Sequence, residues 1–261
     1  MNIIVCVKSV PITIGAELMV DGSKKRVVLD GTPFDINEWD EYALEEAVRL
    51  KERLGGNVTV VTVSSRNVDD VILKCLAKGA DRAIKIVDES IQEYDAYAVT
   101  RILHAVIKNM NYDLILCGAQ AGDDGYALIG VMLASLLEIP YATMARKLEL
   151  INGYVRVTRE LEEGFEEVVE VKLPALLTIQ TGINEPRYAS IMSIRRAKQK
   201  DIISLDLKSL GIIESDFENR IEIQEFFIPE KKKECIMLHG DVDEIVTKVV
   251  EVLMQRGARG F

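Results

Sequence analysis

Short apolar segments alternate with helical segments along the first two thirds of this 261-residue chain. Five short apolar runs have the length that is typical of strands, and the run at residues 58–63 is β-branched throughout. Because most of these runs are continuously apolar, they indicate strands that are buried on both faces of a sheet. The expected strands are residues 3–7, 58–63, 83–87, 113–118 and 176–179.

Helical periodicity fills the intervals between these runs. Asn37 is placed to cap the first helix, and Gly55-Gly56 is placed to end it. The later helices are expected at residues 68–78, 94–110 and 127–137. This β-α-β-α order predicts an α/β fold with right-handed crossovers, in which a doubly wound, mostly parallel, Rossmann-like sheet forms the centre.

Two β-hairpin insertions interrupt the alternation, at residues 18–29 and 148–157. They contain Asp21-Gly22 and Asn152-Gly153, dipeptides that favour the primed turns of tight hairpins. After residue 200 the alternation fades, until a final amphipathic helix near residues 241–256. We therefore expect residues 201–261 to form a C-terminal arm that packs on another chain; a helical appendage on the same domain is the alternative.

Charge and cysteine content narrow the class of protein. The net charge of −10 argues against nucleic acid as the main partner. No apolar run has the length of a membrane span, and the N-terminus lacks the basic region of a signal peptide. The cysteines are scattered and form no metal-binding pattern with the two histidines. We expect a cytoplasmic protein with reduced, buried cysteines and no metal site; the cysteines are Cys6, Cys75, Cys117 and Cys235.

The segment after the fourth strand is the first place to look for a ligand, because open parallel sheets bind ligands outside the carboxyl ends of their strands. It is rich in glycine and runs directly into a helix, which suits a phosphate group. Asp123 and Asp124 would repel a bare anion and suit helix caps, hydroxyl acceptors or partners of a cation. A simple capped loop is the alternative, since the segment matches no established phosphate-binding motif.

Three further clusters follow strands at the same expected edge and could enclose an adenosine together with the glycine-rich segment. They are Val7-Lys8-Ser9, residues 35–38 with Asn37, and Ser64 with its neighbour. Ordinary loop chemistry is the alternative for each. A catalytic triad would have to recruit His104 from the middle of a helix. The sequence therefore does not support an enzyme with its own acid–base chemistry.

Residues 155–188 carry a more specific pattern. Arg159-Glu160-Leu161-Glu162-Glu163-Gly164 leads to Leu173-Pro174-Ala175-Leu176-Leu177-Thr178, and then to Asn184-Glu185-Pro186-Arg187-Tyr188. These segments closely resemble the signature of the electron-transfer flavoprotein β subunit. The resemblance extends over about residues 1–200.

The resemblance implies a heterodimer with a larger α subunit that carries the redox flavin, an FAD. In most of the family the β subunit binds AMP in a structural role, whereas in electron-bifurcating members it binds a second FAD that accepts hydride from NADH. It also implies that residues 1–200 form a nucleotide-binding domain and that the arm wraps the α subunit. The residues expected at the nucleotide are Val7, Lys8, Ser9, Asn37, Ser64, Gly118, Gln120, Asp123, Asp124, Gly125, Ala127, Leu128, Ile129 and Gly130.

The resemblance further implies a recognition loop, residues 183–200, that docks on acyl-CoA dehydrogenases. Ile191 takes the position of an apolar anchor, and Arg195, Arg196 and Lys198 form a basic fringe that could steer an acidic partner. A plain amphipathic helix is the alternative. The residues expected to recognise the partner are Asn184, Glu185, Pro186, Arg187, Tyr188, Ile191, Arg195 and Arg196.

The chain departs from the family where the ligand is selected. AMP-binding members often have Asn, Gln and Thr at the positions of Ala127, Leu128 and Ile129, and Asp124 and Leu128 also differ from the bifurcating pattern. We favour AMP over FAD. The expected function is electron shuttling between acyl-CoA or similar dehydrogenases and a downstream acceptor, without independent catalysis. The alternatives are electron bifurcation and a stand-alone ATP-binding stress-type protein.

Overall fold

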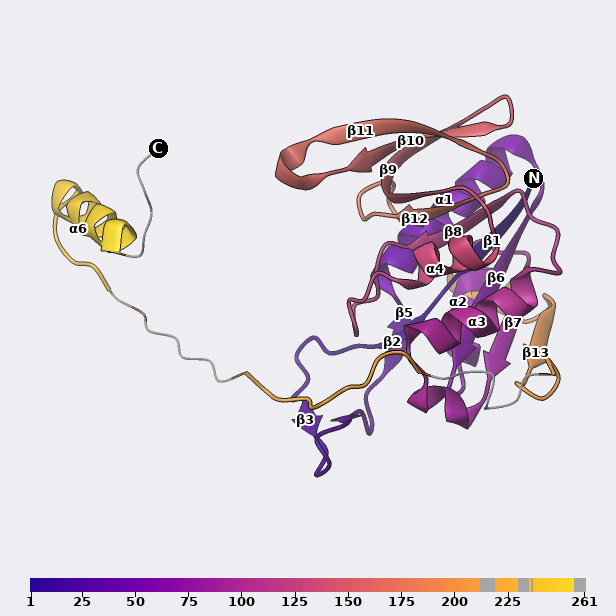
Figure 1. Cartoon of the computed structure of the whole chain (residues 1–261), viewed down its shortest axis with the longest axis horizontal. Helices are drawn as coiled ribbons and strands as arrows, with labels where there is room; N and C mark the ends of the chain where they lie inside the picture. The colour runs from indigo at the N-terminus through magenta and orange to yellow at the C-terminus, as the bar shows by residue number, and fades with distance from the viewer. Residues whose placement is uncertain (212–218, 230–234, 236, 256–261) are drawn as a thin grey trace. The chain divides into compact units, whose positions relative to one another are not determined.

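The computed structural model describes residues 1–211, 219–229, 235 and 237–255. Within them, residues 1–226 form one compact unit, and the chain from Phe227 belongs to a second. Figure 1 shows the central sheet of the first unit with helices packed against it. None of the helices in the described residues is both long and apolar enough to cross a membrane.

A nine-stranded sheet forms the core of the first unit, as far as the described residues define it. Its parallel members occur in the order β9, β12, β8, β1, β6, β7 and β13, and the antiparallel strands β10 and β11 extend it beyond β9. The strands are β1 (Asn2–Cys6), β6 (Asn57–Ser64), β7 (Arg82–Val87), β8 (Leu114–Gly118), β9 (Tyr141–Ile151), β10 (Tyr154–Glu160), β11 (Glu166–Lys172), β12 (Ala175–Ile179) and β13 (Ile202–Leu205). The five predicted strands are confirmed.

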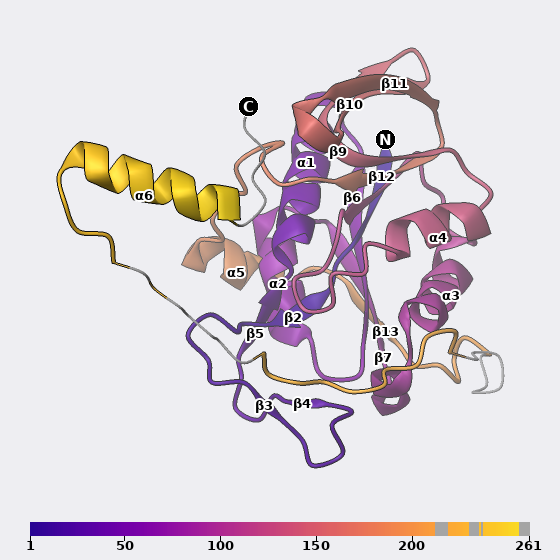
Figure 2. The same cartoon turned by 60° about the vertical axis from the view of Figure 1, so that its left-hand side comes forward.

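Helices cover both faces of this sheet, as Figure 2 shows. The helices are α1 (Glu38–Leu54), α2 (Asp69–Lys78), α3 (Ala96–Ile107), α4 (Ile129–Leu136) and α5 (Ile191–Ala197). α1 and α2 bury their apolar sides against one face of β1, where Ile3 and Val5 point. α3 and α4 pack on the opposite face, where Ile4 and Cys6 point. The predicted doubly wound fold is confirmed, because successive strand side chains point to opposite faces and each face has its own helices.

The chain changes direction across the sheet between β1 and β8. From β1 it moves outward through α1 to β6 and through α2 to β7, and then returns to β8 on the other side of β1. Adjacent strands with oppositely directed connections leave a crevice at their carboxyl ends, the topological switch point of an α/β sheet. The loops that follow β1 and β8 meet at this point.

The two hairpins are present, but their turns differ. Asn152 and Gly153, between β9 and β10, both have positive φ, as a type I′ turn requires. In the other hairpin, between β3 (Met19–Val20) and β4 (Val27–Val28), the residue with positive φ is Lys24. The tight turn predicted at Asp21-Gly22 is therefore wrong. Asp21 instead organises a longer loop, because its carboxylate accepts hydrogen bonds from the backbone N–H groups of Lys25 and Arg26.

The chain beyond residue 200 contributes to both units. β13 pairs with β7 at the edge of the sheet. Asp95, the N-cap of α3, accepts hydrogen bonds from the backbone N–H groups of Arg220 and Ile221, which ties that segment to the first unit. In the second unit, α6 (Val242–Gln255) has no buried residue, and most of its apolar side chains are exposed.

The cysteines follow the sequence prediction in part. Cys6, Cys75 and Cys117 are free and buried, whereas Cys235 is free and exposed. The expectation that every cysteine is buried is therefore wrong for Cys235. Its segment lies in the second unit, outside the cores that bury the other three.

Candidate functional site

Lys8 follows β1, and its ammonium group lies between two carboxylates of the loop that follows β8. Its Nζ is 2.7 Å from Oδ1 of Asp123 and 2.6 Å from Oδ2 of Asp124. Burial alone would lower the pKa of Lys8, but its attraction to Asp123 and Asp124 outweighs burial and holds that pKa above the ordinary value. The sequence left several roles open for the two aspartates. The structure shows that both are partners of a cation, the ammonium group of Lys8.

Asp40, on the first turn of α1, contacts the same two loops through their backbone. Its Oδ2 accepts a hydrogen bond of 2.7 Å from the N–H of Lys8, and its Oδ1 accepts one of 2.9 Å from the N–H of Gly118. Burial raises the pKa of Asp40 to about 7, although both N–H groups favour the charged carboxylate. Asp40 was not among the residues predicted from the sequence, because an aspartate in the first turn of a helix is common for reasons of the helix dipole alone.

Asn37 precedes α1, but its side chain makes no capping hydrogen bond to the helix. Its Nδ2 donates to the carbonyl oxygen of Gln120 at 2.8 Å, and its Oδ1 accepts from the N–H of Gly122 at 3.0 Å. The predicted capping role is therefore wrong. An amide side chain offers one donor and one acceptor side by side, and the loop after β8 satisfies both.

The rest of that loop is open to solvent. Residues 122–128 are exposed, and Gly125 and Ala127 have positive φ. α4 begins at Ile129 without a side-chain cap. Gly130 is different, because it is buried and a Cβ there would lie 2.5 Å from Cγ2 of Thr178 on β12. Its lack of a side chain lets α4 pack closely on the sheet.

Three more predicted residues lie at the ends of β1 and β6. Val7 is buried, and its N–H donates to Val61 on β6. Ser64 accepts a hydrogen bond from the N–H of Arg66 through its hydroxyl group. The hydroxyl group of Ser9 is buried and has no hydrogen-bond partner within the described part of the chain. We define the switch-point site as Lys8, Ser9, Asn37, Asp40 and residues 118–130.

The recognition loop is attached to α1 by its polar residues. The Nδ2 of Asn184 donates to the carbonyl oxygen of Tyr42 and to Glu46. Arg187 forms ion pairs with Glu45 and Glu52, at 2.9 and 2.6 Å. The hydrogen bonds that Arg187 donates to Glu52 and Glu45 raise the pKa of its guanidinium further above its usual range.

Glu45 and Glu52 were not among the residues predicted from the sequence. Burial would raise the pKa of Glu45, but hydrogen bonds from Arg187 and Arg49 hold it below its usual value. The hydrogen bond from Arg187 likewise lowers the pKa of Glu52. Glu45 and Glu52 lie seven residues apart on one face of α1, and that spacing is the signal that could have identified them as a pair.

Three apolar residues of the recognition loop are exposed to solvent. Tyr188 is 99% exposed and Ile191 is 73% exposed, and Met192 beside it is exposed as well. Ser190 caps α5 by accepting a hydrogen bond from the N–H of Ser193. Arg195 and Arg196 are exposed in the last turn of the same helix. Met192 was not among the predicted residues, although it extends the apolar surface of Tyr188 and Ile191.

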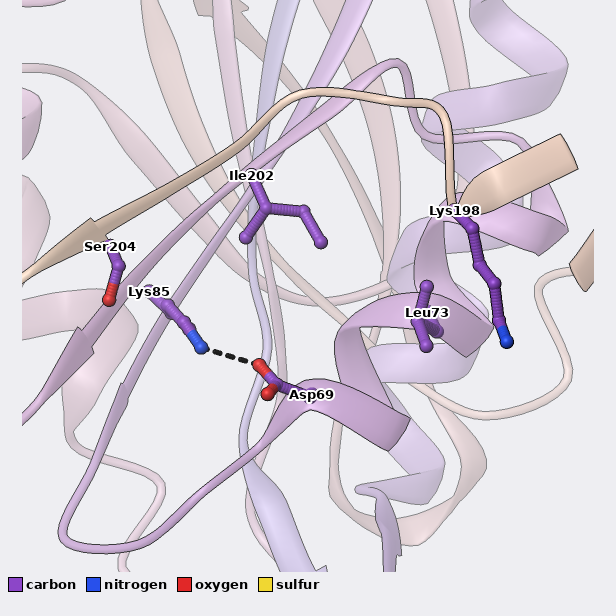
Figure 3. Close-up of a pocket in the computed structure, with 6 residues that line it drawn as sticks. All are labelled: Asp69, Leu73, Lys85, Lys198, Ile202 and Ser204. Carbon is purple, nitrogen blue, oxygen red and sulfur yellow. Dashed lines mark hydrogen bonds and ion pairs between the residues drawn. The ribbon is translucent and has the colours of Figure 1, made fainter. Parts of the chain in front are cut away.

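A cavity of about 450 Å³ lies away from the switch-point site. Figure 3 shows its lining side chains, among which Lys85 forms an ion pair with Asp69. Asp69 of this pair is half-exposed, and Leu73 and Ile202 supply apolar walls. Of the residues in the predicted recognition loop, Lys198 lines the cavity. Within the described residues, no group of three or more His, Cys, Asp or Glu side chains could hold a metal ion.

Fold and site together define a doubly wound α/β protein with a polar site at the switch point between β1 and β8. The family model of the electron transfer flavoprotein domain matches residues 25–210. The electron transfer flavoprotein subunit beta of Methylophilus methylotrophus is 39% identical over 227 residues, covering 84% of this chain and 86% of that protein. The chain belongs to the electron transfer flavoprotein family, and the relatives that it matches are β subunits.

Other relatives show that the similarity extends to nearly the full length. The subunit beta of Bacillus subtilis is 39% identical over 225 residues, covering 86% of this chain and 87% of that protein. The subunit beta of Thermoanaerobacterium thermosaccharolyticum is 35% identical over 264 residues, covering 98% of this chain and 99% of that protein. The resemblance inferred from residues 155–188 is confirmed.

Proposed function

We propose that this chain is the β subunit of a heterodimeric electron transfer flavoprotein. It carries electrons, together with an α subunit, between acyl-CoA or similar dehydrogenases and a downstream acceptor. The name shared by its relatives supports an α partner. The uncovered apolar residues of α6, among them Val246, Val249 and Leu253, support an arm that packs on another chain. FAD, shared with the α subunit, supplies the electron-carrying chemistry.

The switch-point site is proposed to bind AMP in a structural role, and the meeting of Lys8 with the loop after β8 is the observation that carries this proposal. The buried, unpartnered hydroxyl group of Ser9 offers a hydrogen bond to a polar ligand. The exposed backbone of residues 125–128 and the uncapped start of α4 suit a phosphate. Asp123 and Asp124 are engaged with Lys8, so the cluster has a net negative charge and suits ribose hydroxyl groups better than phosphate.

A second FAD is the alternative occupant. Ala127 and Leu128 are exposed and offer no side-chain donors, and Leu128 could pack on the edge of a flavin. Because AMP needs only the backbone donors and the hydroxyl acceptors of this site, we favour AMP. An ATP-binding stress-type protein that acts alone is disfavoured. Such a protein needs neither the Asn184–Tyr188 segment nor an exposed apolar surface on α6.

The recognition loop is proposed to dock on the dehydrogenase through Tyr188 and Ile191. Arg195 and Arg196 would steer an acidic partner. Asn184 and Arg187 hold the loop on α1, so their contribution to recognition is to fix its position. We propose no catalytic residue in this chain, and the buried free thiols of Cys6, Cys75 and Cys117 are compatible with the cytoplasm.

Purification of the chain with its α subunit tests the proposal. Nucleotides released by denaturation are identified by mass spectrometry and counted against the protein. We expect one FAD and one AMP per heterodimer. Two FAD and no AMP would replace the AMP assignment by bifurcation, and bound ATP without any α subunit would overturn the family role.

A further inference from the structure

One buried carboxylate joins the two loops of the switch-point site. Asp40 accepts the N–H of Lys8 with one oxygen and the N–H of Gly118 with the other, at 2.7 and 2.9 Å. Lys8 follows β1, and Gly118 ends β8. These two strands are neighbours in the sheet but lie more than 100 residues apart in the sequence. Asp40 therefore adds a buried link between two loops that also meet through the pairing of β1 with β8, through Asn37 and through the more exposed ion pairs of Lys8.

The packing around Asp40 shows that this contact is closely fitted. A Cβ at position 118 would lie 2.4 Å from Oδ1 of Asp40 and 2.7 Å from Cβ of Trp39, so only glycine allows the approach. Trp39 extends the same connection to a third strand, because its Nε1 donates to Oε1 of Gln180 just after β12. The first turn of α1 thus ties together the carboxyl ends of β1, β8 and β12.

We propose that Asp40 is the positioning residue of the switch-point site and that its ionised form is the one that holds both loops. This inference rests on the proposed function where it concerns AMP. A carboxylate has an acceptor on each oxygen for the two N–H groups. A protonated carboxyl group carries its hydrogen on one oxygen, and that hydroxyl oxygen is a weaker acceptor for an N–H group than a carboxylate oxygen is. Protonation therefore weakens the hold of Asp40 on one loop.

The surroundings of Asp40 place this change near neutral pH. Burial raises its pKa to about 7 against the hydrogen bonds that favour the charged form. The charged and titratable groups that face it are Lys8 from the loop after β1, Cys117 from β8 and Cys75 from α2. Burial raises the pKa of Cys75 above its usual range, and that of Cys117 is raised by its hydrogen bond with Cys6 and by burial, so both thiols stay neutral.

An NMR titration of the full chain tests the positioning role without any ligand. The backbone N–H resonances of Lys8 and Gly118 are followed between pH 5 and pH 8.5. We expect both to shift together with one common midpoint, and we expect no such shift in Asp40→Asn. Resonances of the unaltered chain that do not titrate, or that titrate with separate midpoints, would overturn the proposal. This outcome is read from the unaltered chain and does not depend on the folding of a variant. Glu41→Gln is the matched control, because Glu41 is a neighbouring carboxylate on α1 that pairs with Lys78 instead.

Titration calorimetry with AMP tests the consequence for binding. We expect the affinity of the unaltered chain to fall about tenfold from pH 8.5 to pH 5.5, as loss of one hydrogen bond to a charged group predicts. Asp40→Asn should bind weakly at both pH values, since its amide has a single acceptor oxygen. An unaltered pH profile in Asp40→Asn contradicts the role of Asp40. Absence of AMP binding at every pH in the unaltered chain contradicts the proposed function instead, and the NMR result still decides the role of Asp40.

Discussion

Arg187 and Glu45 form a bidentate ion pair that joins the recognition loop to α1. Nε of Arg187 lies 2.9 Å from Oε2 of Glu45, and Nη2 lies 3.1 Å from Oε1. The Glu45 side chain is only 4% exposed, so its charge depends on this partner and on Arg49. The loop that presents Tyr188 and Ile191 is therefore held in place from within the protein.

Arg187→Ala should destabilise the protein, because it leaves the buried carboxylate of Glu45 without its main partner. We expect a loss of about 2–3 kcal/mol in the free energy of unfolding, since breaking a buried pair costs about 3–5 kcal/mol and Arg187 is partly exposed. Urea denaturation measures the change. Arg195→Ala, an exposed arginine in the same loop, should change stability by less than about 0.5 kcal/mol. Equal losses of unfolding free energy in the two variants would show that the ion pair of Arg187 with Glu45 contributes no more than an exposed arginine does.

Ile191→Ala should weaken electron transfer from the dehydrogenase and leave the flavin content of the heterodimer unchanged. Its side chain is exposed and supports no core, so truncation removes partner contact alone. An apolar anchor at the centre of an interface contributes on the order of 2 kcal/mol, which corresponds to a rate roughly thirtyfold lower at limiting partner concentration. Stopped-flow reduction of the bound flavin measures the rate. Val168→Ala, an exposed apolar residue of β11, is the control, and equal rates in the two variants would refute the docking role of Ile191.

Lys8→Met should loosen the loop after β8. It leaves Asp123 and Asp124 facing each other without a cation, and like charges at that distance repel. We expect AMP affinity to fall by about tenfold and proteolysis within residues 119–128 to become faster. Lys85→Met removes the ion pair with Asp69 at the cavity of Figure 3 and serves as the control. If both lysine variants lose AMP to the same extent, the effect belongs to global stability.

Asp40 should make stability fall as the pH rises. Its pKa is about 7 in the folded protein and close to 3.8 when unfolded, so the folded state binds the extra proton between these values. Its contribution to stability is fully present below about pH 4 and is lost as the pH rises through 7. The difference of about three pH units corresponds to about 4 kcal/mol. Urea denaturation of the unaltered chain and of Asp40→Asn across this range isolates the effect, because the other titrating groups are common to both. Parallel pH profiles would show that Asp40 does not titrate in this window.

The secondary structure could be predicted from the sequence because the signals are local. A β-branched apolar run identified β6, and an apolar run ending at Gly118 identified β8. Helical periodicity ending at Gly55 and Gly79 identified α1 and α2. The turn at Asn152-Gly153 was predicted for the same reason, since both residues favour positive φ. The tight turn predicted at Asp21-Gly22 was wrong, because the Asp21 carboxylate binds backbone groups four and five residues later and draws them into a longer loop.

The candidate site was predicted as a set of loops but not as a set of contacts. Lys8 and the two aspartates were each identified, yet their pairing joins residues 115 and 116 positions apart. Asp40, Glu45 and Glu52 were missed, because in sequence they look like ordinary charges on an exposed helix. Asn184 and Arg187 were predicted to contact a partner. The structure shows that they contact α1, and their contact with a partner stays a prediction.

The sequence by itself determined the order of strands and helices, the family and the position of the polar loops along the chain. These depend on periodicity and on short motifs, both of which are set by residues close together in the chain. Only the tertiary structure decided which charges are buried, which loops meet and which face of the recognition loop is free. Asp40 reaches Gly118 across 78 residues and Glu45 reaches Arg187 across 142. The burial and the hydrogen bonds that shift their pKa values exist only once the sheet has assembled.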